Sequence, residues 1–123
     1  MQYALLIYEP ADSFRRTLPP EQQEKIYGEY MKYSEDLQNA GVVRGGAPLQ
    51  TTDTATTVRQ RDGKAVDTDG PFAETKEWLA GFFLIECKDL NEALAWAKKI
   101  PGVKYGASVE VRPLMEIPER VSR

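Results

Sequence analysis

Two short runs of consecutive apolar residues constrain the fold of this chain more than any other feature. They are Tyr3–Tyr8 and Gly81–Glu86. Each run is too short for a typical helix. Because the side chains of a strand alternate between its two faces, both runs are expected to be strands with apolar residues on both faces. A sheet that contains these strands therefore needs a cover on each side.

A helix of about 20 residues is predicted after the first strand, because its start, its periodicity and its end are all recognisable. The chain leaves the first strand through Glu9-Pro10 and then reaches Pro19-Pro20-Glu21, where proline suits the first helical turn. Asn39-Ala40-Gly41 is a typical helix end. Between these points apolar residues recur at helical spacing, at Ile26, Tyr30, Tyr33 and Leu37.

A second helix is predicted directly after the second apolar run. Asp89 is expected to cap its N-terminus, with the acidic Glu92 three residues later. Lys98 and Lys99 suit the dipole at its C-terminus, and Pro101-Gly102 ends it. Its one apolar stripe consists of Leu90, Ala93, Leu94, Ala97 and Ile100.

The remaining strands are shorter. Val42-Val43-Arg44 is expected to be one, and Gly45-Gly46 beside it either allows a close approach of backbone or ligand or forms a bulge. Thr56–Arg61 and Lys64–Thr68 flank Asp62-Gly63, the pattern of a type I′ hairpin. Ser108–Arg112 alternates between apolar and polar residues.

This order, β-α-β, a hairpin and then β-α-β, predicts an α+β fold of the ferredoxin-like kind. Its antiparallel sheet would carry both helices on one face. The other face would then expose either Phe82 and Leu84 or Phe83 and Ile85, an apolar patch that a monomer does not leave wet. We therefore expect a homodimer, in which the two sheets close face to face into a dimeric α+β barrel.

The composition narrows the function. The 123 residues are expected to form one domain, 1–123, with an ordered core of about 2–114. The net charge is 16 − 19 = −3, and no basic cluster is evident, so nucleic acid is not an expected partner. No apolar run is long enough for a membrane span, and the single cysteine, Cys87, suits a cytoplasmic protein. Because the chain has no histidine, catalysis would depend on carboxylates, lysines, tyrosines or arginines.

The densest polar segment outside the helices lies between the hairpin and the second apolar run. It contains Asp69 as a candidate general base, Lys76 as a candidate for binding an anionic substrate, and Phe72 to stack or exclude water. The alternative is a tight turn at Asp69-Gly70-Pro71 followed by solvated polar residues.

Three further residues are candidates for substrate binding. Arg112 is suited to hold a carboxylate; the alternative is that Arg112 and Glu110, on one strand face, pair across the sheet with each other's neighbours or with Glu86. Arg44, near the glycine pair, either faces the same cleft as the Asp69 loop or is a solvated basic residue at a strand end. Tyr8, at the end of the first strand, is the tyrosine best placed to reach a pocket.

Four other residues are assigned to packing. Tyr27, Tyr30 and Tyr33 have helical spacing, which favours core or dimer packing over a ligand cage. Cys87 is expected to be an inert core thiol.

The polar segment also carries a family resemblance. Its nine residues are complete here: Asp69-Gly70-Pro71-Phe72-Ala73-Glu74-Thr75-Lys76-Glu77. This run resembles the motif that names the DGPFAETKE (DGPF-domain) family, a bacterial branch of the YCII-related proteins. The resemblance extends over nearly the whole chain, through both apolar runs, Gly45–Leu49 and Val109–Pro113. It implies a dimeric α+β barrel of ferredoxin-like subunits.

The resemblance is less informative about activity. YCII-like relatives carry a His-Asp pair proposed as an acid-base site, and one branch eliminates chloride from a ring-cleavage product. This chain keeps Asp69 but has no histidine. Members of the branch are often encoded beside extracytoplasmic-function sigma factors, which implies an accessory or regulatory connection.

Two functions follow from the sequence. One is a lyase, isomerase or hydrolase without metal or cofactor, acting on a small, anionic molecule near residues 69–77. The other is a non-catalytic binding or accessory module in which the same loop is structural or forms an interface.

Overall fold

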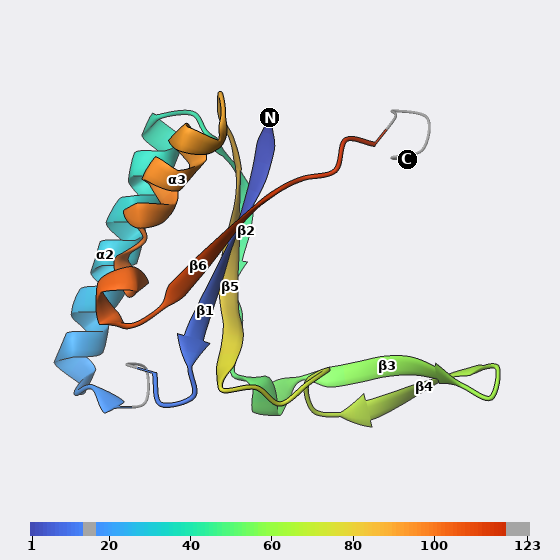
Figure 1. Ribbon diagram of the computed structural model, residues 1–123. Helices are drawn as coiled ribbons and strands as arrows, with labels where there is room; N and C mark the ends of the chain where they lie inside the picture. The colour runs from blue at the N-terminus through green and yellow to red at the C-terminus, as the bar shows by residue number, and fades with distance from the viewer. Residues whose placement is uncertain (14–16, 118–123) are drawn as a thin grey trace.

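The computed structural model describes residues 1–13 and 17–117 (Figure 1). Its central element is an antiparallel sheet with the strand order β2-β5-β1-β6. These strands are β1 (Gln2–Pro10), β2 (Val43–Pro48), β5 (Glu77–Glu86) and β6 (Ser108–Pro113). The two apolar runs, in β1 and β5, are the central strands, and this order is that of the ferredoxin-like fold.

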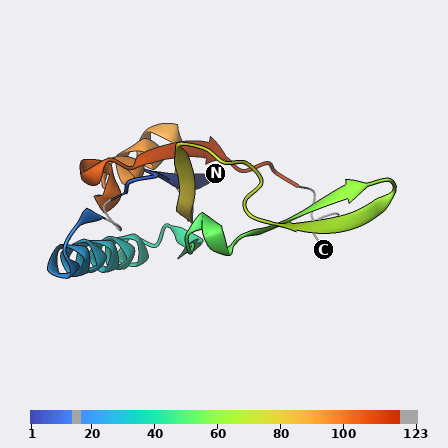
Figure 2. The same cartoon turned by 90° about the horizontal axis from the view of Figure 1, so that it is seen from below.

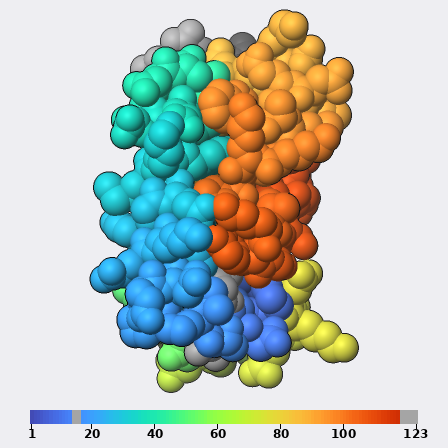
Figure 3. Space-filling model, turned by 90° about the vertical axis from the view of Figure 1, so that its left-hand side faces the viewer, coloured from blue at the N-terminus to red at the C-terminus, as the bar shows by residue number. Residues whose placement is uncertain are grey.

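Two helices cover one face of this sheet, as predicted (Figures 1 and 3). They are α2 (Pro20–Asn39) and α3 (Leu90–Lys98). Pro19 and Pro20 stand at the start of α2, and the Asp89 carboxylate caps α3 by accepting the Glu92 N–H at 3.0 Å. A 3₁₀ helix that the sequence analysis missed, η2 (Pro101–Tyr105), follows α3 and packs against α2.

The core lies between the helices and the sheet. Tyr3, Leu5 and Ile7 alternate along β1 and are all buried on the helix side. From α2, Tyr33 is buried, and its hydroxyl donates to the Trp96 carbonyl at 2.8 Å. Cys87 is buried in the same cluster, and burial raises the pKa of its thiol, which confirms the assignment of this residue to the core.

Polar contacts fix α2 against η2. The Tyr30 hydroxyl accepts the Gly102 N–H at 3.1 Å, and the Tyr105 hydroxyl donates to Glu29 at 2.8 Å. Lys104 also pairs with Glu29, and hydrogen bonds from Lys104 and Tyr105 lower the pKa of the Glu29 carboxyl. These contacts therefore join the middle of α2 to η2.

The register of the strands decides which apolar residues face away from the helices. Leu6 pairs with Phe82 and Ala4 with Leu84, so these four side chains share the open face of the sheet. Phe83 instead contacts Tyr33 of α2, with ring centroids 5.3 Å apart. Of the two alternatives that the sequence left open, the pair Phe82 and Leu84 is thus the one on the open face.

The predicted hairpin is an arm outside the main sheet. After the short 3₁₀ helix η1 (Thr52–Thr54), strands β3 (Thr56–Arg61) and β4 (Lys64–Asp69) pair only with each other. Asp62 and Gly63 have φ values of 51° and 79°, as a type I′ turn requires. The arm projects from the loop end of β5 on the side of the sheet away from the helices (Figures 1 and 2).

The glycine pair forms both a bulge and a close approach. The register of β2 against β5 shifts between Val43 and Gly45. At Gly46, with φ +149°, a Cβ atom would lie 2.6 Å from the Phe82 carbonyl oxygen. Because the backbones are this close, β2 continues through the glycines to Pro48 instead of ending at Arg44.

Within the described part of the chain, no helix is long and apolar enough to cross a membrane.

Candidate functional site

The turn at Asp69 is fixed to the base of the arm. Asp69 is the last residue of β4. The Gly70 N–H donates to the Ala55 carbonyl at 2.8 Å, and the Thr57 hydroxyl donates to the Gly70 carbonyl at 2.8 Å. These bonds determine the backbone of the turn and leave the Asp69 side chain exposed.

Phe72 lies on the surface of the arm. Its side chain is 76% exposed, and the Arg59 guanidinium lies 5.1 Å from the ring centroid. The same guanidinium donates to the Phe72 carbonyl at 3.1 Å. Arg59 of β3 therefore holds both the ring and the backbone of the loop.

Lys76 marks the end of the loop next to the main sheet. Its carbonyl accepts the Ala11 N–H at 2.9 Å, which joins the loop to the chain beyond β1. Its side chain is exposed, as are those of Asp69 and Phe72. In a single chain, these three side chains therefore line no enclosed pocket.

Arg112 and Tyr8 both lie on the open face. Arg112 pairs across strands with Ala4, and Tyr8 with Ser108. The Arg112 Nε donates to Glu110 Oε2 at 2.8 Å, and this hydrogen bond and the Glu110 charge raise the pKa of the guanidinium. Tyr8 is also opposite Leu79, near the end of β5 where the loop enters. Of the sheet residues predicted for the site, Tyr8 is thus the one nearest to the loop.

Arg44 lies at the other end of the sheet. Its guanidinium is 3.5 Å from Glu86, the last residue of β5, whereas the loop joins β5 at Glu77. It also donates to the Gly41 and Val43 carbonyls, at 3.0 and 2.9 Å. One chain therefore does not bring Arg44 together with Asp69, Phe72 and Lys76.

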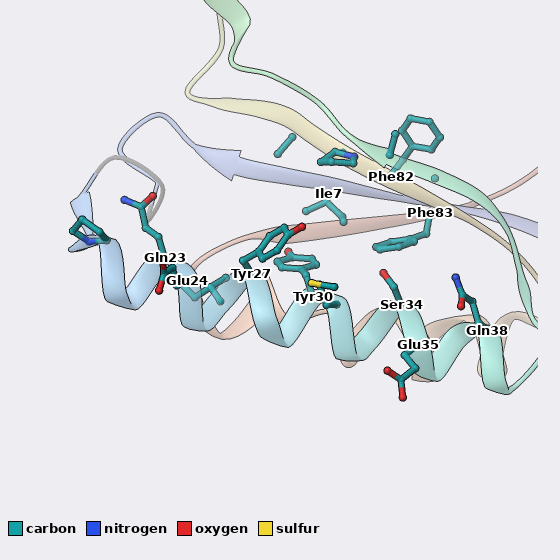
Figure 4. Close-up of a pocket in the computed structure, with 18 residues that line it drawn as sticks. Ile7, Gln23, Glu24, Tyr27, Tyr30, Ser34, Glu35, Gln38, Phe82 and Phe83 are labelled. Atoms are coloured by element: carbon teal, nitrogen blue, oxygen red, sulfur yellow. The ribbon is translucent and has the colours of Figure 1, made fainter.

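The sequence analysis missed a groove between α2 and the β2–β5 side of the sheet, with a volume of about 970 Å³ (Figure 4). None of the six predicted site residues lines it. Its helical wall includes Tyr27, Tyr30, Met31 and Ser34, whose spacing defines a second face of α2 beside the core face. This spacing is the feature of the sequence from which the groove could have been predicted. Of the two packing roles predicted for the tyrosines, core packing is confirmed for Tyr33, whereas Tyr27 is 68% exposed and outside the core, and its dimer packing stays a prediction.

Among the described residues, no group of three or more Cys, Asp or Glu side chains is arranged to hold a metal ion.

Comparison with known proteins gives three findings. The YCII-related domain family matches residues 1–118. An uncharacterised protein of Rhizobium meliloti (strain 1021) is 37% identical over 115 residues, which is 93% of this chain and 92% of that protein. Among solved structures, 5-chloro-2-hydroxyhydroquinone dehydrochlorinase (TftG) of Burkholderia phenoliruptrix AC1100, in complex with 2,5-dihydroxybenzoquinone, has a similar fold. Its TM-score is 0.51 and its identity 17%, with 94% of each chain covered.

Proposed function

Because the chain belongs to the YCII-related domain family, we propose that it forms a homodimer through the open faces of its sheets and binds a small carboxylic acid there, beside residues 69–77. The coarser part of this function, a YCII-related protein with a ferredoxin-like α+β fold, follows directly from the family match and the fold.

The observation that carries the proposal is the apolar strip on the open face. Leu6, Phe82 and Leu84 lie side by side there and are only half-buried in one chain. The arm projects from the same side of the sheet (Figures 1 and 2), where it would contact a molecule bound on that face. A second copy supplies both a matching apolar strip and a second arm, as expected for an isologous contact.

The polar residues suit an anionic ligand. Arg112 and Tyr8 lie on the open face, and Lys76 is at the point where the loop meets the sheet. The Arg112 guanidinium already pairs with Glu110, so a substrate carboxylate would share or replace this partner. In the dimer, Phe72 would cover the ligand, because its ring is exposed on the arm. Arg44, which pairs with Glu86 at the other end of the sheet, is not part of the proposed site.

Asp69 is the proposed general base. By removing a proton from the carbon next to the ligand's carboxylate, Asp69 would allow the loss of a leaving group from the adjacent carbon, or isomerisation when the proton returns to another carbon. By taking a proton from water that attacks the ligand, it would instead allow hydrolysis, again without a metal or cofactor. The similarity of fold to a dehydrochlorinase that binds a small cyclic molecule supports a small-molecule function. It does not identify the reaction.

The alternative is a non-catalytic binding or accessory module. It is favoured by the exposure of Asp69, Phe72 and Lys76 in one chain, which also suits a loop that contacts a protein. The Asp69→Asn variant separates the two functions. If Asp69 is a general base, the variant should still bind the ligand, because only the proton acceptor is lost. If Asp69 contacts another protein, the variant should instead weaken that assembly.

Assembly is tested first, by analytical ultracentrifugation at micromolar concentration. We expect the wild-type chain to sediment as a dimer and Leu6→Asp as a monomer, because the new carboxylate would be buried between two sheets. Val103→Asp is the matched control, since Val103 is 41% exposed on the helical side. A wild-type monomer, or a Leu6→Asp dimer, would contradict the proposal.

Ligand binding is tested with benzoate, followed by NMR of the arginine Nε–H groups. Benzoate is expected to shift the Arg112 signal, and Arg112→Gln should weaken binding about tenfold, the effect of losing one charge-assisted bond. The signal of Arg44, at the other end of the sheet, is the internal reference. Equal shifts at both arginines would indicate a non-specific salt effect.

A further inference from the structure

We propose that the groove between α2 and the sheet is a second binding site, which takes an uncharged, flat aromatic molecule. The inference goes beyond the proposed function, because the groove lies on the opposite face of the sheet from the anion site and none of the six residues predicted for that site lines it. Figure 4 shows the Phe82 ring directed away from the groove, toward the open face, while Phe83 lies between the sheet and α2. A dimer formed through the open faces would leave the groove accessible.

The size of the groove suits a molecule of a few rings. Its volume is about 970 Å³, at the upper end of the roughly 300–1,000 Å³ that small-molecule sites occupy. It is bounded by Ile26, Tyr27 and Tyr30 of α2 on one side and by Ala80 and Phe83 of β5 on the other. The walls are thus largely aliphatic and aromatic, as in sites for apolar ligands.

Two glycines explain why space remains between the helix and the sheet. Gly46 pairs with Phe83, and Gly81 pairs with Ile7, so both positions belong to the face that carries the helices. A side chain at either position would begin in this layer. The backbones of β2 and β5 are too close at these positions to accept a side chain, since a Cβ at Gly81 would lie 2.9 Å from the Ala47 carbonyl oxygen. The close pairing of β2 and β5 therefore keeps this part of the helix face free of side chains.

The exposed apolar residues of α2 lie on this groove. Tyr27 is 68% exposed and Met31 58% exposed, although both are on a helix that buries other residues well. A planar ring placed between them and Phe83 would gain stacking with Tyr27 and a sulfur contact with Met31. Ser34 and Gln38 lie at the far end of the groove, where they can donate to or accept from one polar group (Figure 4).

The described residues along the groove offer no positive charge to an anion. The described residues that line it include two carboxylates, Glu24 and Glu35, and no lysine or arginine. Glu35 points away from the groove, toward solvent (Figure 4). An anionic ligand would lose hydration without gaining a counter-charge. The open face, where Arg112 lies, is the reverse, and the charges of the described lining residues favour an uncharged ligand in the groove.

The test uses two dyes with the same skeleton. N-phenyl-1-naphthylamine is uncharged, and 8-anilinonaphthalene-1-sulfonate adds one sulfonate. Both dyes are added to the Arg112→Gln variant, in which the proposed anion site is weakened. We expect the uncharged dye to bind with enhanced fluorescence, and the sulfonate to bind at least about tenfold more weakly. Equal affinity for both dyes would overturn the charge argument.

Variants then locate the dye. Ser34→Trp places a large side chain in the groove and is expected to abolish binding. Glu35→Trp, at the neighbouring position that points to solvent, should leave it unchanged. If Ser34→Trp fails to fold by circular dichroism, Met31→Asp is the second variant. Met31 is exposed, so the change is tolerated, and its carboxylate would weaken binding of an apolar ring about tenfold.

The remaining outcomes are also decisive. Leu6→Asp should keep the dye site, so that a failure of the dimer and a failure of the groove are separate results. Unchanged dye binding in Ser34→Trp would overturn the proposal. A change in sedimentation of Ser34→Trp without a change in dye binding would show that the groove contacts a second copy, and would overturn it as well.

Discussion

Gly46 combines two constraints that act at the level of one residue. Its φ of +149° is a conformation that residues with side chains rarely adopt, and an added Cβ would lie 2.6 Å from a carbonyl oxygen of β5. The oxygen belongs to the backbone of a paired strand, so it cannot move without disturbing the sheet. Gly28, by contrast, lies in α2 with nothing within 4 Å of an added Cβ.

We expect Gly46→Ala to lower the free energy of unfolding by about 1–3 kcal/mol, because strain and overlap act together. Gly28→Ala should raise it by about 0.5–1 kcal/mol, because alanine loses less entropy in a helix. Urea denaturation of both variants checks this. A result in which the two substitutions have the same sign would contradict the assigned role of Gly46.

At the scale of elements, the arm differs from the rest of the fold. Strands β3 and β4 contribute no residue to the buried core, and Val58 on β3 is 67% exposed. A two-stranded hairpin of this kind is marginally stable on its own. Its base is held by the bonds from Gly70 to Ala55 and from Thr57 to Gly70. The stability of the outer part of the arm therefore depends on contacts with another molecule.

Amide hydrogen exchange should reveal this dependence. In Leu6→Asp, which is expected to be monomeric, the amides of β3 and β4 should exchange at least about a hundredfold faster than those of β1 and β5, because the arm opens locally at little cost. In the wild-type chain, arm protection should rise with protein concentration as the dimer forms. Strong protection of the arm amides in the monomeric variant would contradict the inference that the arm is stabilised by contact with the second copy.

At the scale of the whole molecule, the two faces of the sheet differ in how they are covered. The helix face has a cover within the chain, formed by α2 and α3 (Figure 3). The open face has Leu6, Phe82 and Leu84 without a helix over them. These apolar side chains of the central strands thus contribute fully to stability only when the open face is covered.

The melting temperature should consequently depend on protein concentration. If folding is coupled to dimer formation, the wild-type melting temperature rises with concentration by mass action, and that of Leu6→Asp stays constant at a lower value. Differential scanning calorimetry over a hundredfold range of protein concentration measures this effect. Such a range changes the free energy of dimer dissociation by about 2.7 kcal/mol through mass action. A constant wild-type melting temperature would show that the folded monomer is stable alone.

Much of the fold was predictable because its signals are local. The proline start of α2, the Asp89 cap of α3 and the Asp62-Gly63 turn each depend on a few adjacent residues, and all three are present. The 3₁₀ helix η2 was missed because its stabilising partners, Glu29 and Tyr30, lie on α2, more than seventy residues away.

The candidate site was predictable only in part. The segment from Asp69 to Lys76 is visible as a dense polar run, but its position at the base of an arm depends on bonds to Ala55 and Ala11. Arg44 and Arg112 look alike in sequence, each a basic residue at a strand end. The sheet places Arg112 on the open face and pairs Arg44 with Glu86 at the far end.

The sequence alone determined the type and order of the elements, because the alternation of strands, the periodicity of helices and the residues of turns act over a few positions. Only the tertiary structure decided which side of β5 faces the helices and where a groove remains. A one-residue change of register exchanges the two faces of a strand. The pairing of β5 with β1 and β2 therefore determines that Phe82 and Leu84 are open, and that Gly46 and Gly81 lie together under α2.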